Sequence, residues 1–169
     1  MLAFRFQRAR PSLTLLGLAA LLAACSLGRD ERSAQATEQA AVDAARDAML
    51  AAARALRGTD LKAIGRWASC PGGIGQRYVG GGSMKAPKGN IAGQLEAIRS
   101  AVAAAGFTDV TQVKENVTMQ RDDISVNLNY NRVYEGWPLS FRSTCHTYPR
   151  ADAKRVKSSA NREIEGLSP

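Results

Sequence analysis

The chain has 169 residues, of which 45% are hydrophobic and 22% are charged. This length suits one domain with its own core and is too short for two ordinary domains, which cluster at roughly 100–150 residues each. The formal net charge is +8 and the aromatic content only 6%, which argues against an aromatic-rich platform for carbohydrate or single-stranded nucleic acid.

Residues 1–24 have the three parts of a secretory signal peptide. Residues 1–10 contain three arginines and no acidic residue, and an apolar run from Ser12 to Ala24 follows and ends in small residues. That run is too short for a membrane-spanning helix, which needs about 20 apolar residues. Removal of residues 1–24 leaves 20 basic and 15 acidic residues, a net charge of +5. This balance suits contact with anionic headgroups or wall polymers, and no nucleic-acid partner is expected.

The end of this segment, Leu22-Ala23-Ala24-Cys25, resembles the lipobox of bacterial lipoproteins. The resemblance implies cleavage before Cys25 and lipidation of its thiol; an ordinary signal peptide with an accidental cysteine is the alternative. Two or three acyl chains on one residue hold a protein stably on a membrane. We therefore expect a protein anchored through lipid to the cell membrane or outer membrane, facing the extracytoplasmic side. Residues 25–34 would be the lipidated cysteine and a polar tether.

Residues 35–57 are expected to form a long amphipathic helix. They contain no Gly or Pro, and their apolar positions recur at three- and four-residue steps, at Val42, Ala45, Met49, Ala52 and Leu56. Gly58 suits the position after the helix. Thr59-Asp60 can cap a second short helical turn, which would carry apolar residues toward the same core, namely Leu61, Ile64 and Trp67.

The next stretch, residues 70–83, contains six glycines. It lacks the third glycine of a dinucleotide-binding fingerprint and the Gly-Lys-Ser/Thr of a P-loop, so no cofactor is expected there. We expect an edge strand around residues 76–79, flanked by flexible turns. Asn90 then opens a second helix with an apolar stripe, and Gly106 ends it; the stripe consists of Ile91, Leu95, Ile98 and Val102.

Three strand candidates follow the second helix, within residues 109–120, 124–131 and 139–146. Apolar and polar residues alternate in each, and the links are short, which is typical of an antiparallel meander with one face buried. The expected fold of residues 35–149 is a two-layer α+β sandwich, with two helices packed on an antiparallel sheet of three to four strands. Residues 150–169 are basic and poor in apolar residues, which predicts a flexible tail.

Two cysteines remain once Cys25 is assigned to the lipid, namely Cys70 and Cys145. An even pair in an exported protein usually forms a disulfide. The strand phase places Cys145 with Leu139 and Phe141, pointing toward the core. Free buried thiols are the alternative, and a redox-active pair is disfavoured because the chain has no Cys-x-x-Cys.

No catalytic or metal site is predicted. The single histidine, His146, lies near a cysteine and not in a cluster of metal ligands, and no Gly-x-Ser-x-Gly nucleophile turn is present. The wet face of the predicted sheet instead offers candidate ligand-binding residues, namely Asn127, Asn129, Arg142 and His146. Such side chains suit a polar, mildly anionic ligand: a glycan, a wall polymer or an acidic protein patch. The alternative is that they only keep an exposed sheet soluble.

A family resemblance rests on several of these features together. They are the lipobox cysteine, the Ala-rich helix, a cysteine after a Trp-bearing turn, a second helix ended by glycine, and a meander that ends in Pro138-Leu-Ser-Phe-Arg-Ser-Thr-Cys145. This pattern resembles the small secreted lipoproteins of actinobacteria of the LppA-like type. The resemblance implies localisation and fold and brings no active site.

Three functions remain open from the sequence. We favour a lipid-anchored, non-catalytic binding or interaction module, whose further partner would be a cell-wall polymer or another envelope protein. A passive structural surface lipoprotein is the first alternative, and an envelope hydrolase with an unreadable site is the second.

Overall fold

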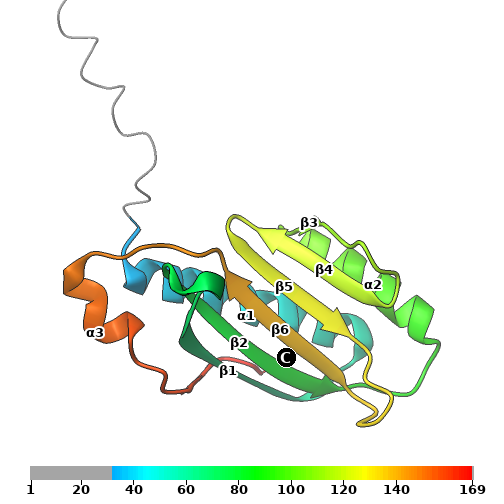
Figure 1. The fold of residues 1–169 in the computed structure, drawn as a ribbon. Coiled ribbons are helices and arrows are strands. Elements are labelled where there is room, and N and C mark those ends of the chain that lie inside the picture. Colours follow the sequence, from blue (N-terminus) through cyan, green and yellow to red (C-terminus); the bar gives the residue numbers. More distant parts are fainter. Residues whose placement is uncertain (1–31, 169) are drawn as a thin grey trace, which may run out of the picture. The chain divides into compact units, whose positions relative to one another are not determined.

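The computed structural model describes residues 32–168, which begin with the long helix expected from the sequence (Figure 1). Helix α1 (Ala34–Leu56) starts at Ser33, whose side-chain oxygen accepts a hydrogen bond from the amide of Ala36 at 3.1 Å. Such a cap satisfies one of the free amides of a first turn. The buried stripe of α1 is wider than expected and consists mostly of alanines, which lets the helix lie close to the sheet.

The strands of the described chain form one seven-stranded antiparallel sheet in the order β3-β4-β5-β6-β2-β1-β7. Their bounds are β1 (Thr59–Ser69), β2 (Gln76–Lys85), β3 (Thr108–Asp109), β4 (Asn116–Arg121), β5 (Ile124–Asn129), β6 (Trp137–Ser143) and β7 (Arg162–Glu163). The predicted meander is present as β4-β5-β6. The sheet exceeds the predicted three to four strands because β1 and β2 extend it beyond β6. The short strands β3 and β7 are added at its two edges.

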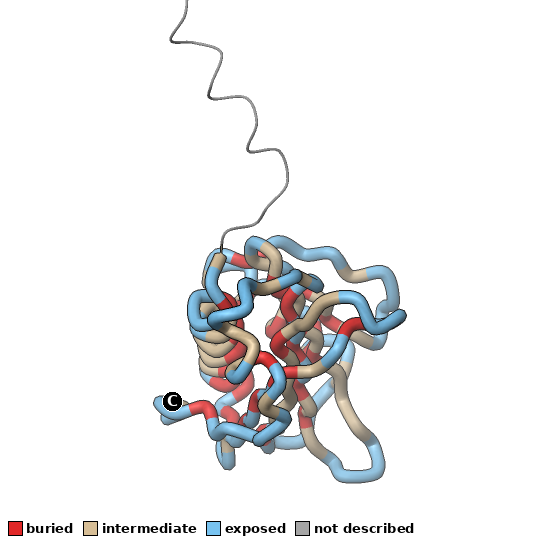
Figure 2. Tube along the Cα trace, turned by 60° about the vertical axis from the view of Figure 1, so that its left-hand side comes forward, coloured by how far each residue is buried: buried red, intermediate tan, exposed pale blue. Residues whose placement is uncertain are grey.

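Helix α2 (Ile91–Ala104) confirms the second predicted helix. The side chain of Asn90 accepts a hydrogen bond from the amide of Ala92 at 3.2 Å. Both α1 and α2 contact the same sheet, α1 over β6, β5 and β2, and α2 over β4 (Figure 1). Buried positions concentrate between these helices and the sheet (Figure 2). The α+β class is therefore confirmed, and no helix within residues 32–168 covers the other face of the sheet.

Residues 59–69 form strand β1 and not the predicted helical turn. Burial alternates along the strand, with Ala63, Gly65 and Trp67 facing the helices, whereas Ile64 remains 42% exposed. Leu61, Ile64 and Trp67 recur at three-residue steps, which resembles the period of a helix. The two-residue period of the strand is hard to recognise because two of its three inward-pointing positions carry the small residues Ala and Gly.

Strand β2 lies in the interior of the sheet, so the prediction of an edge strand was wrong. The strand runs through the three glycines to Lys85. A Cβ atom at Gly80 would lie 2.2 Å from the carbonyl oxygen of Ile64, and one at Gly82 would lie 2.6 Å from Cε of Met49 on α1. Glycine is required in β2 because neighbouring atoms occupy the space of a side chain, and not because the segment is a turn.

The segment expected to be a flexible tail folds against the domain over residues 150–168. It contains the 3-10 helix η2 (Arg150–Asp152), the short helix α3 (Ala153–Val156) and strand β7. Val156 and Ile164 are buried, and the amide of Ile164 donates to the carbonyl of Ala63 at 2.9 Å. Two apolar side chains and one strand pairing thus hold a segment whose composition is mostly polar.

The predicted signal peptide and Cys25 lie outside the described residues, as does most of the tether. None of the helices within residues 32–168 is long and apolar enough to cross a membrane.

Candidate functional site

The uncovered sheet face carries the polar residues of β4, β5 and β6. Strand register sets Thr118 opposite Asn127, and Ser125 opposite both Gln120 and Arg142. The alternate residues of the same strands, such as Val126 and Phe141, are buried under the helices. Within β4, β5 and β6, the period-two pattern therefore predicted correctly which side chains point away from the core.

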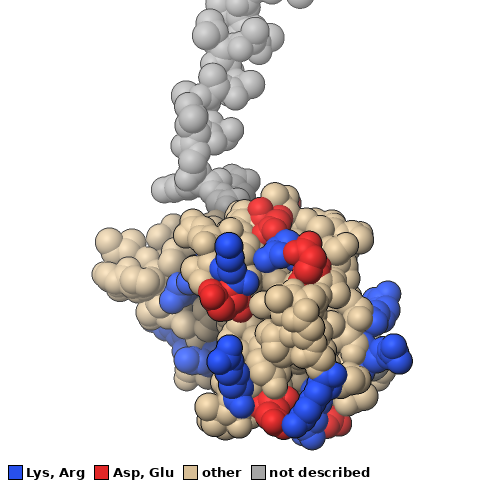
Figure 3. Space-filling model, turned by 90° about the vertical axis from the view of Figure 1, so that its right-hand side faces the viewer, with Lys and Arg blue, Asp and Glu red and all other residues tan. Residues whose placement is uncertain are grey.

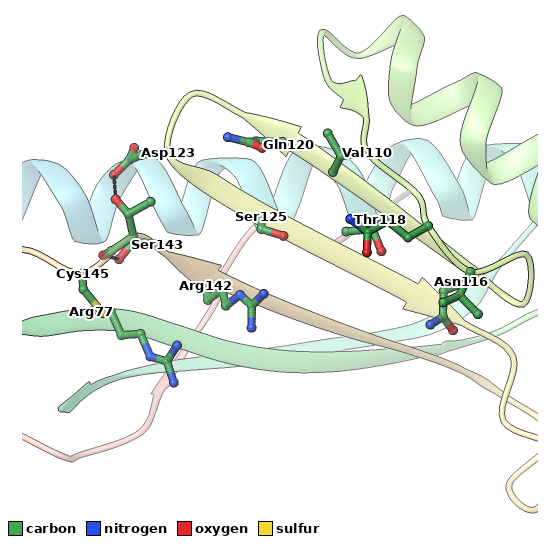
Figure 4. A pocket seen from close by; sticks show the side chains of 13 residues that line it. Arg77, Val110, Asn116, Thr118, Gln120, Asp123, Ser125, Arg142, Ser143 and Cys145 are labelled. Atoms are coloured by element: carbon green, nitrogen blue, oxygen red, sulfur yellow. Dashed lines mark hydrogen bonds between the residues drawn. The ribbon is translucent and has the colours of Figure 1, made fainter. Parts of the chain in front are cut away.

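This face is hollowed by a groove of about 600 Å³ (Figure 4). One wall is the chain after β3, which contributes Val110 and Val113, and the floor is formed by β4, β5 and β6. The polar floor and end residues include Asn116, Thr118, Gln120, Ser125, Thr144 and, from the neighbouring strand β2, Arg77. Amide and hydroxyl groups that donate and accept hydrogen bonds thus line much of the floor, beside the apolar wall of Val110 and Val113.

Arg77 and Arg142 bring positive charge to one end of the groove, from the paired strands β2 and β6 (Figure 4). Arg142 lies directly opposite Val79, two positions along β2 from Arg77. Within residues 32–168, neither guanidinium has an ion pair or a hydrogen bond to another residue. The Nε atom of Arg77 is buried and has no hydrogen-bond partner there. Two unpaired guanidinium groups next to amides and hydroxyls make this end suited to an anion.

Asp123, the acidic residue at the same end, is already neutralised. Its carboxylate pairs with Arg32 and also contacts His146 at 3.1 Å and Thr144 at 3.2 Å. Burial raises the pKa of Asp123, but hydrogen bonds from Arg32 and His146 and the charge of Arg32 lower it by more, so the net shift is downward. Asp123 therefore stays ionised and paired, and Arg77 and Arg142 keep their charge for a ligand.

The contacts of His146 do not match a catalytic triad. Its Nε2 atom lies 2.7 Å from Oγ1 of Thr144 and 3.1 Å from Oδ2 of Asp123. A triad histidine uses one ring nitrogen for the nucleophile and the other for the carboxylate, whereas here one nitrogen faces both groups. Across the described residues, no group of three or more His, Cys, Asp or Glu side chains is placed to hold a metal ion.

The structure separates the four predicted ligand-binding residues. Arg142 lines the groove, whereas the described lining includes neither Asn127 nor Asn129, although both lie on the same face. The amide of Asn127 donates to Oγ1 of Thr118 at 2.8 Å. His146 lies just beyond the end of β6, against Asp123. Arg77 was not among the residues predicted from the sequence, although the alternation with its buried neighbour Tyr78 marks it as outward-facing.

A disulfide between Cys70 and Cys145 lies beside the groove, with Cα atoms 6.0 Å apart. Cys70 is buried, but Cys145 is exposed, so the prediction that it points toward the core was wrong. The reason is that β6 ends at Ser143, and the alternation of the strand does not continue to Cys145. The bond joins the end of β1 to the chain after β6, and Cys145 itself lines the groove.

Charged side chains on another face are dispersed. In the view of Figure 3, Lys and Arg groups stand singly or in small groups on a mostly uncharged surface, and several lie next to acidic groups. That face presents no continuous basic patch of the kind that follows a nucleic-acid backbone.

Comparison with known proteins identifies no relative. No family model matches the chain, and no match is found among the curated proteins or the solved structures. The resemblance to LppA-like lipoproteins therefore stays a prediction from the sequence.

Proposed function

We propose that this protein is a lipid-anchored, non-catalytic binding module of the bacterial cell envelope, and that its groove binds a polar, anionic ligand. The observation that carries the proposal is the pair of unpartnered arginines, Arg77 and Arg142, at one end of a groove lined by uncharged hydrogen-bonding groups. The lipobox-like sequence before Cys25 supports the location.

An anionic ligand explains an arrangement that is otherwise unfavourable. Two guanidinium groups on adjacent strands repel each other, and the buried Nε of Arg77 lacks a partner among the described residues. A carboxylate or phosphate between them would neutralise the repulsion and accept several N–H bonds. Hydrogen bonds to charged groups contribute about 1.5–3 kcal/mol each, enough for a ligand of moderate affinity.

The test measures retention on isolated cell envelopes. The protein is produced from Ser26 onward, without the predicted anchor, and the double variant Arg77→Gln/Arg142→Gln is compared with wild type. The matched control is Arg54→Gln/Arg57→Gln, which removes the same charge in and directly after α1, the helix covering the other sheet face. We expect the groove variant to lose retention and the control to keep it.

Two outcomes would overturn this proposal. Equal retention of the groove variant and wild type would show that the arginines do not bind the envelope component. No retention of the wild type would favour a passive structural lipoprotein.

The anchor is tested separately, on protein expressed in full in a bacterial host that processes lipoproteins. Mass spectrometry should show acyl groups on an N-terminal Cys25, and Cys25→Ala should remain unprocessed or be shed from the membrane. An unmodified mature N-terminus at another residue would place the protein among exported proteins without a lipid anchor.

A further inference from the structure

A second, smaller hollow of about 230 Å³ lies on the same sheet face. Its lining includes Arg66 and Ile64 of β1, and Val79 and Gly81 of β2. Val79 lies opposite Arg66 on one side and opposite Arg142 on the other. The small hollow is therefore the neighbour of the groove across β2, with Val79 between them.

The two hollows lie in line across the strands. Residues opposite one another in register run from Arg66 through Val79 and Arg142 to Ser125 and Gln120, which crosses β1, β2, β6, β5 and β4. With about 4.8 Å between neighbouring strands, the path is about 19 Å long, and Arg66 and Arg142 are about 10 Å apart at their Cα atoms. A ligand that fills this path must be extended.

The charges along the path are spread out. Arg66, like Arg77 and Arg142, has no ion pair or hydrogen-bond partner among residues 32–168. Arg66 stands two strands from Arg142 and adds a positive charge beyond the pair in the groove, which matches a chain that carries a charge at intervals. Asp123 is already paired with Arg32, and Glu163 of β7 lies beyond Arg66, at the edge of the sheet.

We propose that the ligand of the groove is a linear acidic polysaccharide that lies across the strands and reaches Arg66. This inference rests on the proposed function. Amides and hydroxyls on the groove floor suit a backbone rich in hydroxyl groups. Large aromatic rings of the sheet, such as Tyr78, Trp137 and Phe141, are buried on the helix side and do not stack on sugars, so the carboxylates supply the affinity.

The concave shape of the face favours a chain over a flat membrane. Val110 and Val113 of the groove wall are 40% and 52% exposed. A planar bilayer would meet this wall before it reached Arg142 on the floor, whereas a single polymer chain can enter the groove.

The experiment measures the affinity of the same Ser26-onward protein for oligogalacturonates by calorimetry. Digalacturonate fits within one hollow, octagalacturonate can span both, and uncharged malto-octaose controls for length. We expect octagalacturonate to bind at least tenfold more tightly than digalacturonate, and malto-octaose not to bind. Arg66→Gln should lower the affinity for octagalacturonate about tenfold, the equivalent of one charge-assisted hydrogen bond, and leave that for digalacturonate unchanged. Arg54→Gln should alter neither.

Affinity that does not depend on chain length, an Arg66→Gln variant equal to wild type, or equal binding of malto-octaose would each overturn the inference. So would the absence of octagalacturonate binding together with Arg66-dependent binding to phosphatidylglycerol vesicles, which would identify a lipid surface. If these tests fail while the Arg77→Gln/Arg142→Gln variant still loses envelope retention, the proposed function stands and only the ligand class is wrong.

Discussion

Within residues 32–168, Arg77 leaves a polar atom of its side chain unsatisfied. Its Nε atom is buried without a hydrogen-bond partner in the described chain, and an unsatisfied buried polar group costs about 1–3 kcal/mol. We expect Arg77→Met, which keeps the length of the side chain, to leave the free energy of unfolding unchanged or to raise it by about 1 kcal/mol. The same variant should lose envelope retention. Urea unfolding measures the first effect, and a clear loss of stability would mean that Arg77 serves the fold.

Asp123 links the start of the described chain to the turn between β4 and β5, through Arg32. Its pKa is lowered from the usual value of 3.8, so its contribution to stability is present above that value and is lost as the pH falls through the lower, folded-state pKa. We expect Asp123→Asn to cost about 1–3 kcal/mol at pH 7. The difference from wild type should shrink as the pH falls below 3.8 and the native carboxylate is protonated.

Asp122→Asn is the matched control for that measurement. Asp122 occupies the same turn, has a φ of 53° that Asn tolerates, and forms no ion pair among the described residues. The Asp122→Asn variant should unfold like wild type both at pH 7 and at acid pH. If both variants lost the same stability, the effect would belong to the turn and not to the pair with Arg32.

The sequence predicted part of the groove lining. Arg142 was recognised because it lies in a clear alternation with Leu139 and Phe141. Arg66 and Arg77 were missed because their strands were interpreted as a helical turn and as a short edge strand. His146 was assigned to the sheet face by extending a strand that ends at Ser143.

At the level of the elements, β2 depends on glycine and α2 does not. Gly80→Ala would place Cβ against the carbonyl of Ile64 and the ring of Phe141, and we expect it to cost about 1–3 kcal/mol. Gly93 is exposed within α2 and has nothing closer to its Cβ position than Asn90, at 3.7 Å. Gly93→Ala should therefore stabilise the protein by about 0.5–1 kcal/mol. Thermal unfolding of both variants measures the contrast, and a tolerated Gly80→Ala would contradict the close packing of β2.

The elements that the sequence predicted well are those with a strong local pattern. The two long helices have caps at Ser33 and Asn90 and apolar stripes, and β5 alternates without exception. The pairing of β2 with β6 joins residues about 60 positions apart in the chain, such as Val79 and Arg142. No local pattern encodes such a contact, so the central position of β2 could not be derived from the sequence.

At the scale of the whole molecule, the disulfide Cys70–Cys145 closes a loop across most of the sheet. We expect the double variant Cys70→Ala/Cys145→Ala to lose about 2–5 kcal/mol of stability. Non-reducing peptide mapping of the wild type should give one linked peptide, and alkylation of the folded protein should label neither thiol. Cys25→Ala should unfold like wild type, which separates loss of the bond from loss of a cysteine. Free alkylation of both thiols would refute the bond.

The same disulfide limits how far the chain can extend under mechanical tension. The two cysteines are 75 positions apart, so the chain between them, which includes β2 and β4 to β6, forms a covalent ring. For a protein tethered at Cys25, as proposed, tension enters through α1 and β1 and crosses from Cys70 to Cys145 without stretching the ring. The disulfide thereby prevents about 250 Å of chain from being extended. The disulfide would thereby limit how far a polymer bound on the strands of the ring could be drawn away from the membrane.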